Sequence, residues 1–127
     1  MKVQFSRDKV FVPDFNGNKS LPEEQRITVK IGVMEMADFV DIAEALQVVG
    51  NGEISSDKLD PEQLKAMVKS AGQYLPKYAS DLKNLEDDNG PVDVTGLLKF
   101  PIYFGLAAEI LLAIVEASSL SEADVKN

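Results

Sequence analysis

Apolar and polar residues follow a strand-like pattern at three places in the first third of the chain. Residues 3–5 and 27–31 alternate with a period of two, and residues 10–12 form a β-prone run that Pro13 closes. Asn16-Gly17, a dipeptide typical of tight turns, lies between the second and third runs. The pattern predicts a small antiparallel sheet of two or three strands. Such a sheet is marginal alone and must pack against another layer.

Helical spacing replaces this alternation after residue 33. Residues 34–49 place apolar residues on one side and acids mostly on the other, which predicts an amphipathic helix. Gly50-Asn51-Gly52 then supplies residues that leave helical geometry easily, so the helix is predicted to stop there.

A second helix has a clear start signal. Asp60 is a favourable N-cap, Pro61 follows at the first helical position, and Gln63 completes a capping-box pattern. The apolar stripe runs as far as Leu75, and Pro76 is predicted to end or kink the helix at that point. A further turn or two of helix is predicted through residues 78–82.

The acidic segment at residues 85–91 places several oxygen-bearing side chains close together. It does not fit a calcium-binding EF-hand loop, because Leu85 and Gly96 would occupy the first and last ligand positions. An exposed turn at Asn89-Gly90 explains the segment better. A short helix is predicted over residues 92–98, starting near Asp93.

Residues 100–115 are strongly apolar. If helical, this segment has an apolar arc wider than one contact with a small domain needs, so it is either the central element of the fold or a protein interface. It is shorter than a membrane-spanning helix and contains Glu109, so no spanning role is predicted. We predict self-association through this helix, with an interface at Phe100, Tyr103, Phe104, Ala107, Ile110, Leu111 and Ile114.

Together these elements predict an α+β fold in a single domain, residues 1–127. A small antiparallel N-terminal sheet of two or three strands forms a β-rich part over residues 1–32. A bundle of three to five helices over residues 33–117 follows, with the last helix largely buried. Residues 118–127 are a polar tail that is expected to fray.

Composition narrows the chemistry. The 127 residues include no cysteine and no histidine, which excludes disulfides, thiol or imidazole catalysis and histidine or thiolate metal sites. The net charge of −8 argues against direct nucleic-acid binding. Residues 1–50 carry six bases and eight acids, a net of −2, and residues 51–127 carry seven bases and thirteen acids, a net of −6.

Acids are therefore the only catalytic groups available in number. Glu109 and Glu116 lie seven residues apart on one helical face and could form a proton-transfer pair, or they could mark the solvent-facing edge of the helix. The glycines form no phosphate-binding motif. We expect a non-enzymatic protein with no catalytic, cofactor-binding or metal-binding residues, whose partners are proteins.

The order of elements resembles the small tail assembly chaperones of long-tailed bacteriophages and prophages. The resemblance covers nearly the whole chain and is carried by the β-rich start, the helix led by residues 34–39, Leu75-Pro76-Lys77-Tyr78, the turn at residues 84–92, and the ending at residues 118–127. It implies a non-virion protein of the host bacterial cytoplasm. Such a protein binds and solubilises the tape measure protein and helps to recruit major tail subunits.

The resemblance also implies further partners. Many members are made in a longer form by ribosomal frameshifting, and residues 125–127 are compatible with a slippery codon string or with an ordinary polar terminus. The expected partners are the tape measure protein, the major tail protein, the frameshifted longer form and further copies of the chain, with no nucleic acid and no membrane. The start of the chain has no secretory signal, which favours a cytoplasmic location.

Three alternatives remain open from the sequence. The chain could be a structural component of the phage particle, such as a head–tail connector protein. It could be an acidic regulator or inhibitor that binds a basic partner with strong salt dependence. It could also be an enzyme built around a carboxylate pair at Glu109.

Overall fold

The protein has an α+β fold, as the sequence predicts. The computed structural model describes residues 9–49 and 60–118, so the strand predicted at residues 3–5 and most of the predicted tail lie outside the described residues. Strands β1 (Lys9–Phe11) and β2 (Thr28–Ile31) confirm the second and third predicted β runs. With β3 (Ala79–Lys83) they form a three-stranded antiparallel sheet in the order β1-β2-β3.

Strand β3 corrects the sequence prediction, which continued the second helix through residues 78–82. Ala79 pairs with Ile31 and Ser80 with Lys30, and the register then shifts between Thr28 and Lys30. Its residues do not alternate cleanly, because only the first is buried and only the fourth is half-buried. Pairing with β2, which is distant in sequence, is what makes this segment a strand.

Helix α2 (Pro61–Tyr78) begins as the sequence predicts. The Asp60 carboxylate accepts a hydrogen bond from the backbone N–H of Gln63 at 2.8 Å, and the Gln63 side chain accepts one from the backbone N–H of Asp60 at 3.0 Å. The sequence predicts an end or a kink at Leu75, and an end is wrong, because the helix continues through Pro76. The proline removes one hydrogen bond to the carbonyl of Gly72, an exposed residue four positions earlier, where water can replace the lost donor.

Helix α1 (Met36–Val49) packs against α2 through two tyrosine–aspartate contacts. The Tyr74 hydroxyl donates to the Asp41 carboxylate, and the Tyr78 hydroxyl donates to Asp38 at 2.5 Å. Lys77 Nζ lies 2.6 Å from the same Asp38 oxygen. The hydrogen bonds from Lys77 and Tyr78 hold the pKa of Asp38 below its usual value. Two acids on the polar side of α1 therefore fix the helix to its neighbour.

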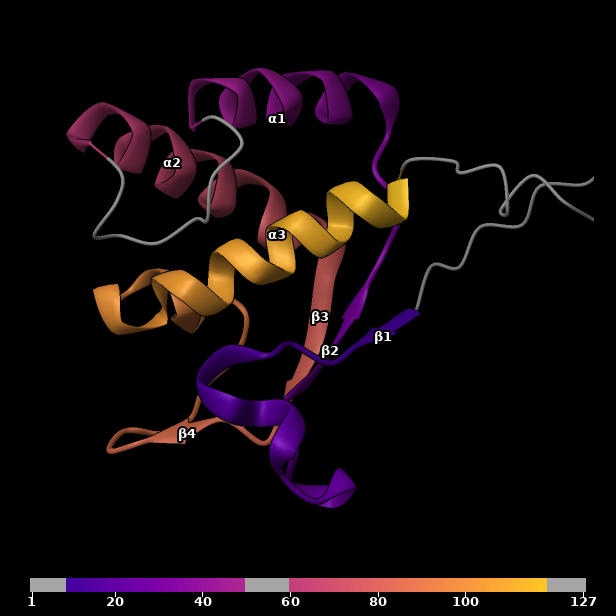
Figure 1. Ribbon diagram of the computed structural model, residues 1–127, viewed down its shortest axis with the longest axis vertical. Coiled ribbons are helices and arrows are strands. Elements are labelled where there is room, and N and C mark those ends of the chain that lie inside the picture. The colour runs from indigo at the N-terminus through magenta and orange to yellow at the C-terminus, as the bar shows by residue number, and fades with distance from the viewer. Residues whose placement is uncertain (1–8, 50–59, 119–127) are drawn as a thin grey trace, which may run out of the picture.

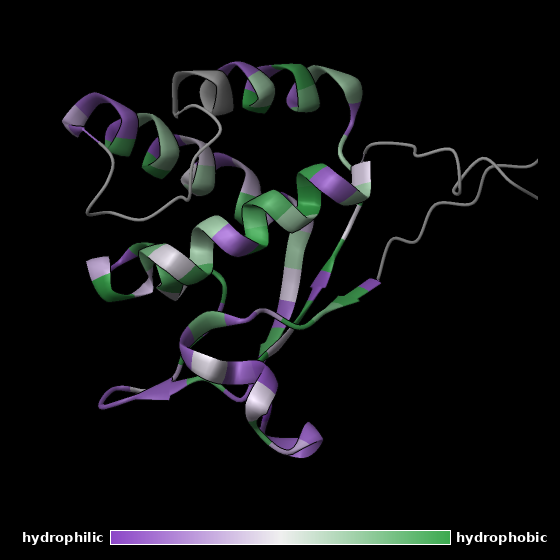
Figure 2. Ribbon diagram, viewed as in Figure 1, coloured by the Kyte–Doolittle hydropathy of each residue, from purple (hydrophilic) through white to green (hydrophobic). Residues whose placement is uncertain are grey.

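Helix α3 (Phe104–Ser118) occupies the centre of the fold. It contacts α1, α2 and β2, and Figure 1 shows it crossing the molecule between the α1–α2 pair and the strands. Figure 2 shows α3 as a mainly hydrophobic ribbon, whereas the small hairpin over residues 86–91 is mainly hydrophilic. The predicted burial of the last helix is confirmed by Leu106, Ala107, Ala108, Ile110, Leu111, Ala113 and Ile114.

The apolar segment Pro101–Ser118, which includes α3, is long and apolar enough to cross a membrane by length and composition alone. A core helix of a globular domain meets the same criterion. Leu106, Ile110 and Leu111 are fully enclosed by the other elements, so packing within the fold accounts for the apolar character of this helix.

The connection between β1 and β2 is held by one buried side chain. It contains the 3₁₀ segments η1 (Phe15–Ser20) and η2 (Glu23–Gln25). The Asn18 side chain is 1% exposed; it donates to the carbonyls of Pro13 and Ile27 at 2.8 and 3.0 Å and accepts from the Ile27 N–H at 2.6 Å. One amide therefore joins both ends of the loop.

A short hairpin confirms the turn predicted at Asn89-Gly90. Strands β4 (Glu86–Asp87) and β5 (Gly90–Pro91) pair around it, and Gly90 has a φ of +106°. The Asp87 carboxylate accepts hydrogen bonds from the Tyr103 hydroxyl at 2.6 Å and from the Asn89 N–H at 2.8 Å, and these bonds lower its pKa. The hairpin is thus attached to η4 (Pro101–Tyr103), the 3₁₀ turn that leads into α3.

The short helix predicted after this turn is present as η3 (Thr95–Leu98), a 3₁₀ helix. The Asp93 carboxylate accepts a hydrogen bond from the Thr95 hydroxyl at 2.7 Å and one from the Gly96 N–H at 2.8 Å. These bonds lower the pKa of Asp93 and confirm that the helical segment starts near this residue.

Removing the Asn18 side chain is expected to destabilise the fold. Asn18→Ala leaves the Ile27 N–H and two carbonyls without their partner, at a cost of about 2–4 kcal/mol in the free energy of unfolding. Lys19→Ala, at an exposed neighbouring position, is the matched control and should change that free energy by less than about 0.5 kcal/mol. Urea unfolding measures both variants, and equal effects would contradict the role given to Asn18.

The contact between α1 and α2 should weaken at alkaline pH. Burial and the hydrogen bond to Asp41 raise the pKa of Tyr74 to about 12, whereas a tyrosine in the unfolded chain titrates near 10. This stabilisation is complete below about pH 10 and is lost as the pH rises from about 10 to about 12. Tyr74→Phe removes the titrating hydroxyl, so its free energy of unfolding should fall less steeply over that range. Identical slopes in urea unfolding would exclude this role of Tyr74.

Candidate functional site: an apolar groove between two helices

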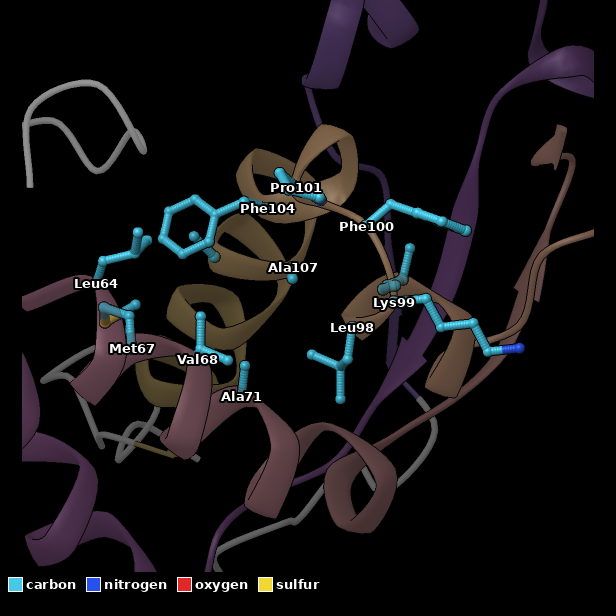
Figure 3. Close-up of a pocket in the computed structure, with 12 residues that line it drawn as sticks. Leu64, Met67, Val68, Ala71, Leu98, Lys99, Phe100, Pro101, Phe104 and Ala107 are labelled. Atoms are coloured by element: carbon cyan, nitrogen blue, oxygen red, sulfur yellow. The ribbon is translucent and has the colours of Figure 1, made fainter. Parts of the chain in front are cut away.

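An open apolar groove lies between α2 and the first half of α3. It encloses a cavity of about 240 Å³, and Figure 3 shows side chains from both helices converging on it. The segment that carries η3 and η4 closes one end. The groove is lined by Leu64, Met67, Val68, Ala71, Leu97, Leu98, Lys99, Phe100, Pro101, Phe104, Ala107 and Ala108.

The groove arises from the side chains that the two helices place against each other. Ala71 on α2 and Ala107 and Ala108 on α3 are small, so the helices do not fill the space between them. The Phe104 ring points across the groove toward Leu64 and Met67 (Figure 3). Small residues at the floor and large residues at the edges make a hollow in an otherwise packed interface.

Part of the groove wall is exposed. Val68 is 47% and Phe100 is 49% exposed, and Ile102, which follows the lining residue Pro101, is 71% exposed. Val68 and Phe100 are apolar side chains at the rim of an apolar hollow, and an apolar partner that covers them removes their surface from water. The edge of the groove is therefore suited to an apolar partner.

The lining favours apolar side chains over a reacting substrate. Its one charged residue is Lys99, and the amine of Lys99 points away from the other lining residues (Figure 3). The cavity is also smaller than pockets for drug-sized ligands, which typically hold roughly 300–1,000 Å³. The groove is therefore of a size and polarity that apolar side chains fit.

The predicted interface residues divide into two groups. Phe100, Phe104 and Ala107 line the groove. The remaining four, Tyr103, Ile110, Leu111 and Ile114, belong to the buried core, and the last three are 0% exposed. A helical wheel of this segment shows an apolar arc but not which part of it the rest of the chain covers.

The sequence prediction did not include the α2 side of the groove. Leu64 and Val68 belong to an apolar stripe that the sequence assigns to packing, and Val68 is nevertheless half-exposed. That stripe has the ordinary width of a core-facing helix, so no signal in the sequence indicates that Val68 stays open to water.

The two glutamates that the sequence offers as a carboxylate pair, Glu109 and Glu116, have different surroundings in the structure. The Glu109 carboxylate accepts a hydrogen bond from the backbone N–H of Asp14 at 2.7 Å, which ties the loop after β1 to α3. Glu116 is exposed. Within residues 9–49 and 60–118, no three acidic side chains gather in a way that could hold a metal ion. The two glutamates therefore fit the edge of a helix better than a shared site.

Comparison of the chain with known proteins adds no family assignment. No protein-family model, no curated protein and no solved structure matches it.

Substitutions in the core and in the groove should have different effects on stability. Leu111→Ala removes a fully buried side chain and should lower the free energy of unfolding by about 2–5 kcal/mol. Phe100→Ser changes a side chain that is half in water and should cost at most about 1 kcal/mol. Thermal or urea unfolding tests this pair, and a large loss with Phe100→Ser would assign this residue to the core instead.

Proposed function

We propose that this protein is a non-enzymatic tail assembly chaperone of a long-tailed phage or prophage. It binds and solubilises the tape measure protein and helps to recruit major tail subunits. The observation that carries the proposal is the open apolar groove between α2 and α3, together with the resemblance of the sequence to this class of chaperones. The expected site of action is the host bacterial cytoplasm.

The groove provides a physical mode of binding. An amphipathic client helix places apolar residues at spacings of three and four, and such a row can enter a groove between two helices. Val68 and Phe100 present apolar surface at the edge, and the hollow above Ala71 and Ala107 receives side chains. This mode suits a long helical client, because each turn of the client offers an equivalent row.

The charge of the chain supports a solubilising role. A net charge of −8 gives the complex an acidic exterior that resists aggregation. The groove lining itself contains no acid, so binding does not require a carboxylate to leave water. The apolar surface that binds the client and the acidic surface that keeps the complex soluble are therefore in different places on the protein.

The other partners in the proposal are proteins as well. They are the major tail protein, a longer frameshifted form of the chain and further copies of the chain itself. A head–tail connector component is the alternative within the same class of particle, and it would be recovered in purified virions. An acidic regulator that binds a basic partner is the alternative from another class, and its binding would weaken strongly with salt.

Co-expression tests the proposal. A candidate tape measure protein produced with this chain should stay soluble and co-purify with it, whereas the same protein produced alone should aggregate. Val68→Ser combined with Phe100→Ser should reduce the recovered complex at least tenfold, because both changes remove apolar surface from the groove. The matched control is Leu21→Ser, an exposed apolar residue outside the groove, which should leave recovery unchanged. If the wild-type chain neither solubilises nor retains the client, the chaperone proposal is wrong.

A further inference from the structure

A second exposed apolar surface lies on α1. Met36 is 75% and Val40 is 50% exposed, and they stand one turn apart on the same row of the helix. We call this pair the α1 ridge. Five of the seven large exposed hydrophobic residues in the described part of the chain belong to the ridge or to the groove edge, namely Met36, Val40, Val68, Phe100 and Ile102.

The ridge has the form that the groove accepts. Helix-in-groove binding uses apolar side chains at positions i and i+4, and Met36 and Val40 have this spacing. Methionine is long and flexible, so it adapts to an irregular hollow such as the one above Ala71 and Ala107. The ridge can therefore supply apolar side chains that fit the apolar lining of the groove.

The charges beside the two surfaces are complementary. Glu44 continues the Met36–Val40 row by one more turn and is exposed. On α2, Lys65 lies three residues before Val68 and Lys69 follows Lys65 by one turn, and both lysines are exposed. A helix that enters the groove with an acid along its ridge meets lysines along the α2 edge. In a chain with an excess of acids, this basic edge favours an acidic partner.

We propose that the α1 ridge of one copy of this protein binds in the groove of a second copy. The partner is a second copy because the chain itself carries the matching ridge, with the right spacing and the right charge. One molecule cannot join its own two surfaces, because α1 is already fixed to α2 through Asp38 and Asp41. The contact joins two different surfaces, so two copies either exchange ridges in a closed pair or add head to tail.

This contact between copies also regulates how many grooves are open to a client. Only this consequence rests on the proposed function. A client and the α1 ridge would compete for the same groove, so oligomers would release free grooves as the client appears. Self-association would then shield the apolar surface in the absence of a client. The contact between copies itself does not depend on any client and is tested with the purified chain alone.

The first test is the mass of the purified chain in solution, by light scattering or sedimentation. The wild type should exceed the 13.9 kDa of one copy at tens of micromolar. Met36→Ser with Val40→Ser, and separately Val68→Ser with Phe100→Ser, should each return the mass to one copy. Val10→Ser with Leu21→Ser changes exposed apolar residues away from both surfaces and should leave the oligomer intact. A monomeric wild type, or ridge and groove variants that keep the wild-type mass, would overturn the proposal.

Mixing the two monomeric variants distinguishes ridge-to-groove pairing from contacts in which each surface binds its own copy. The ridge variant retains a groove and the groove variant retains a ridge, so an equimolar mixture should form a dimer of one copy of each. If the mixture stays monomeric while each variant remains folded by circular dichroism, ridge-to-groove pairing is excluded.

Charge reversal supplies a test that leaves the apolar residues unchanged. Lys65→Glu with Lys69→Glu should weaken association at least fivefold, because the α2 edge then repels Glu44 of the incoming helix. Adding Glu44→Lys to the same chain should restore at least half of the lost affinity. Both changes lie at exposed positions, so the fold should persist in each variant. Weakening without any rescue would show that these lysines do not face Glu44.

Discussion

The burial of α3 is the constraint on which the rest of the structure depends. This helix is apolar on nearly all sides, so it needs cover from several directions at once. α1 and α2 supply one side and the sheet supplies another. Around Ile110 and Leu111 the cover is complete, whereas near Phe104 and Ala107 it leaves a hollow. The core and the groove are therefore two parts of one helix that differ in how fully the chain encloses them.

Polar contacts hold the covering elements in place around this helix. Asn18 joins the ends of the loop between β1 and β2, and Glu109 ties the start of that loop to α3. Asp87 attaches the hairpin to the turn before α3, and Asp38 and Asp41 attach α1 to α2. The abundant acids thus have a structural use beyond solubility, because several of them accept hydrogen bonds from hydroxyl or amide groups of other elements.

The proposed function follows from where the described part of the chain leaves apolar surface uncovered. A protein without cysteine or histidine has few groups for catalysis, and the cavity in this one is lined by aliphatic and aromatic side chains. The exposed ridge on α1 and the groove between α2 and α3 are separate surfaces of opposite shape. We propose that the same groove binds a client helix or the ridge of a neighbouring copy. Without a client, self-association would then shield the apolar surface of the chaperone from water.

The sequence by itself determined the elements whose signals are local. The capping box at Asp60, the turn at Asn89-Gly90 and the apolar run of the last helix each rest on interactions within a few residues. Tertiary structure alone decided that residues 79–83 form a strand, because β2 supplies the hydrogen-bonding partner. It also decided which apolar residues remain open to water. Leu111 and Phe104 look alike on a helical wheel, and only the packing of α2 and the sheet separates a core residue from one that lines a groove.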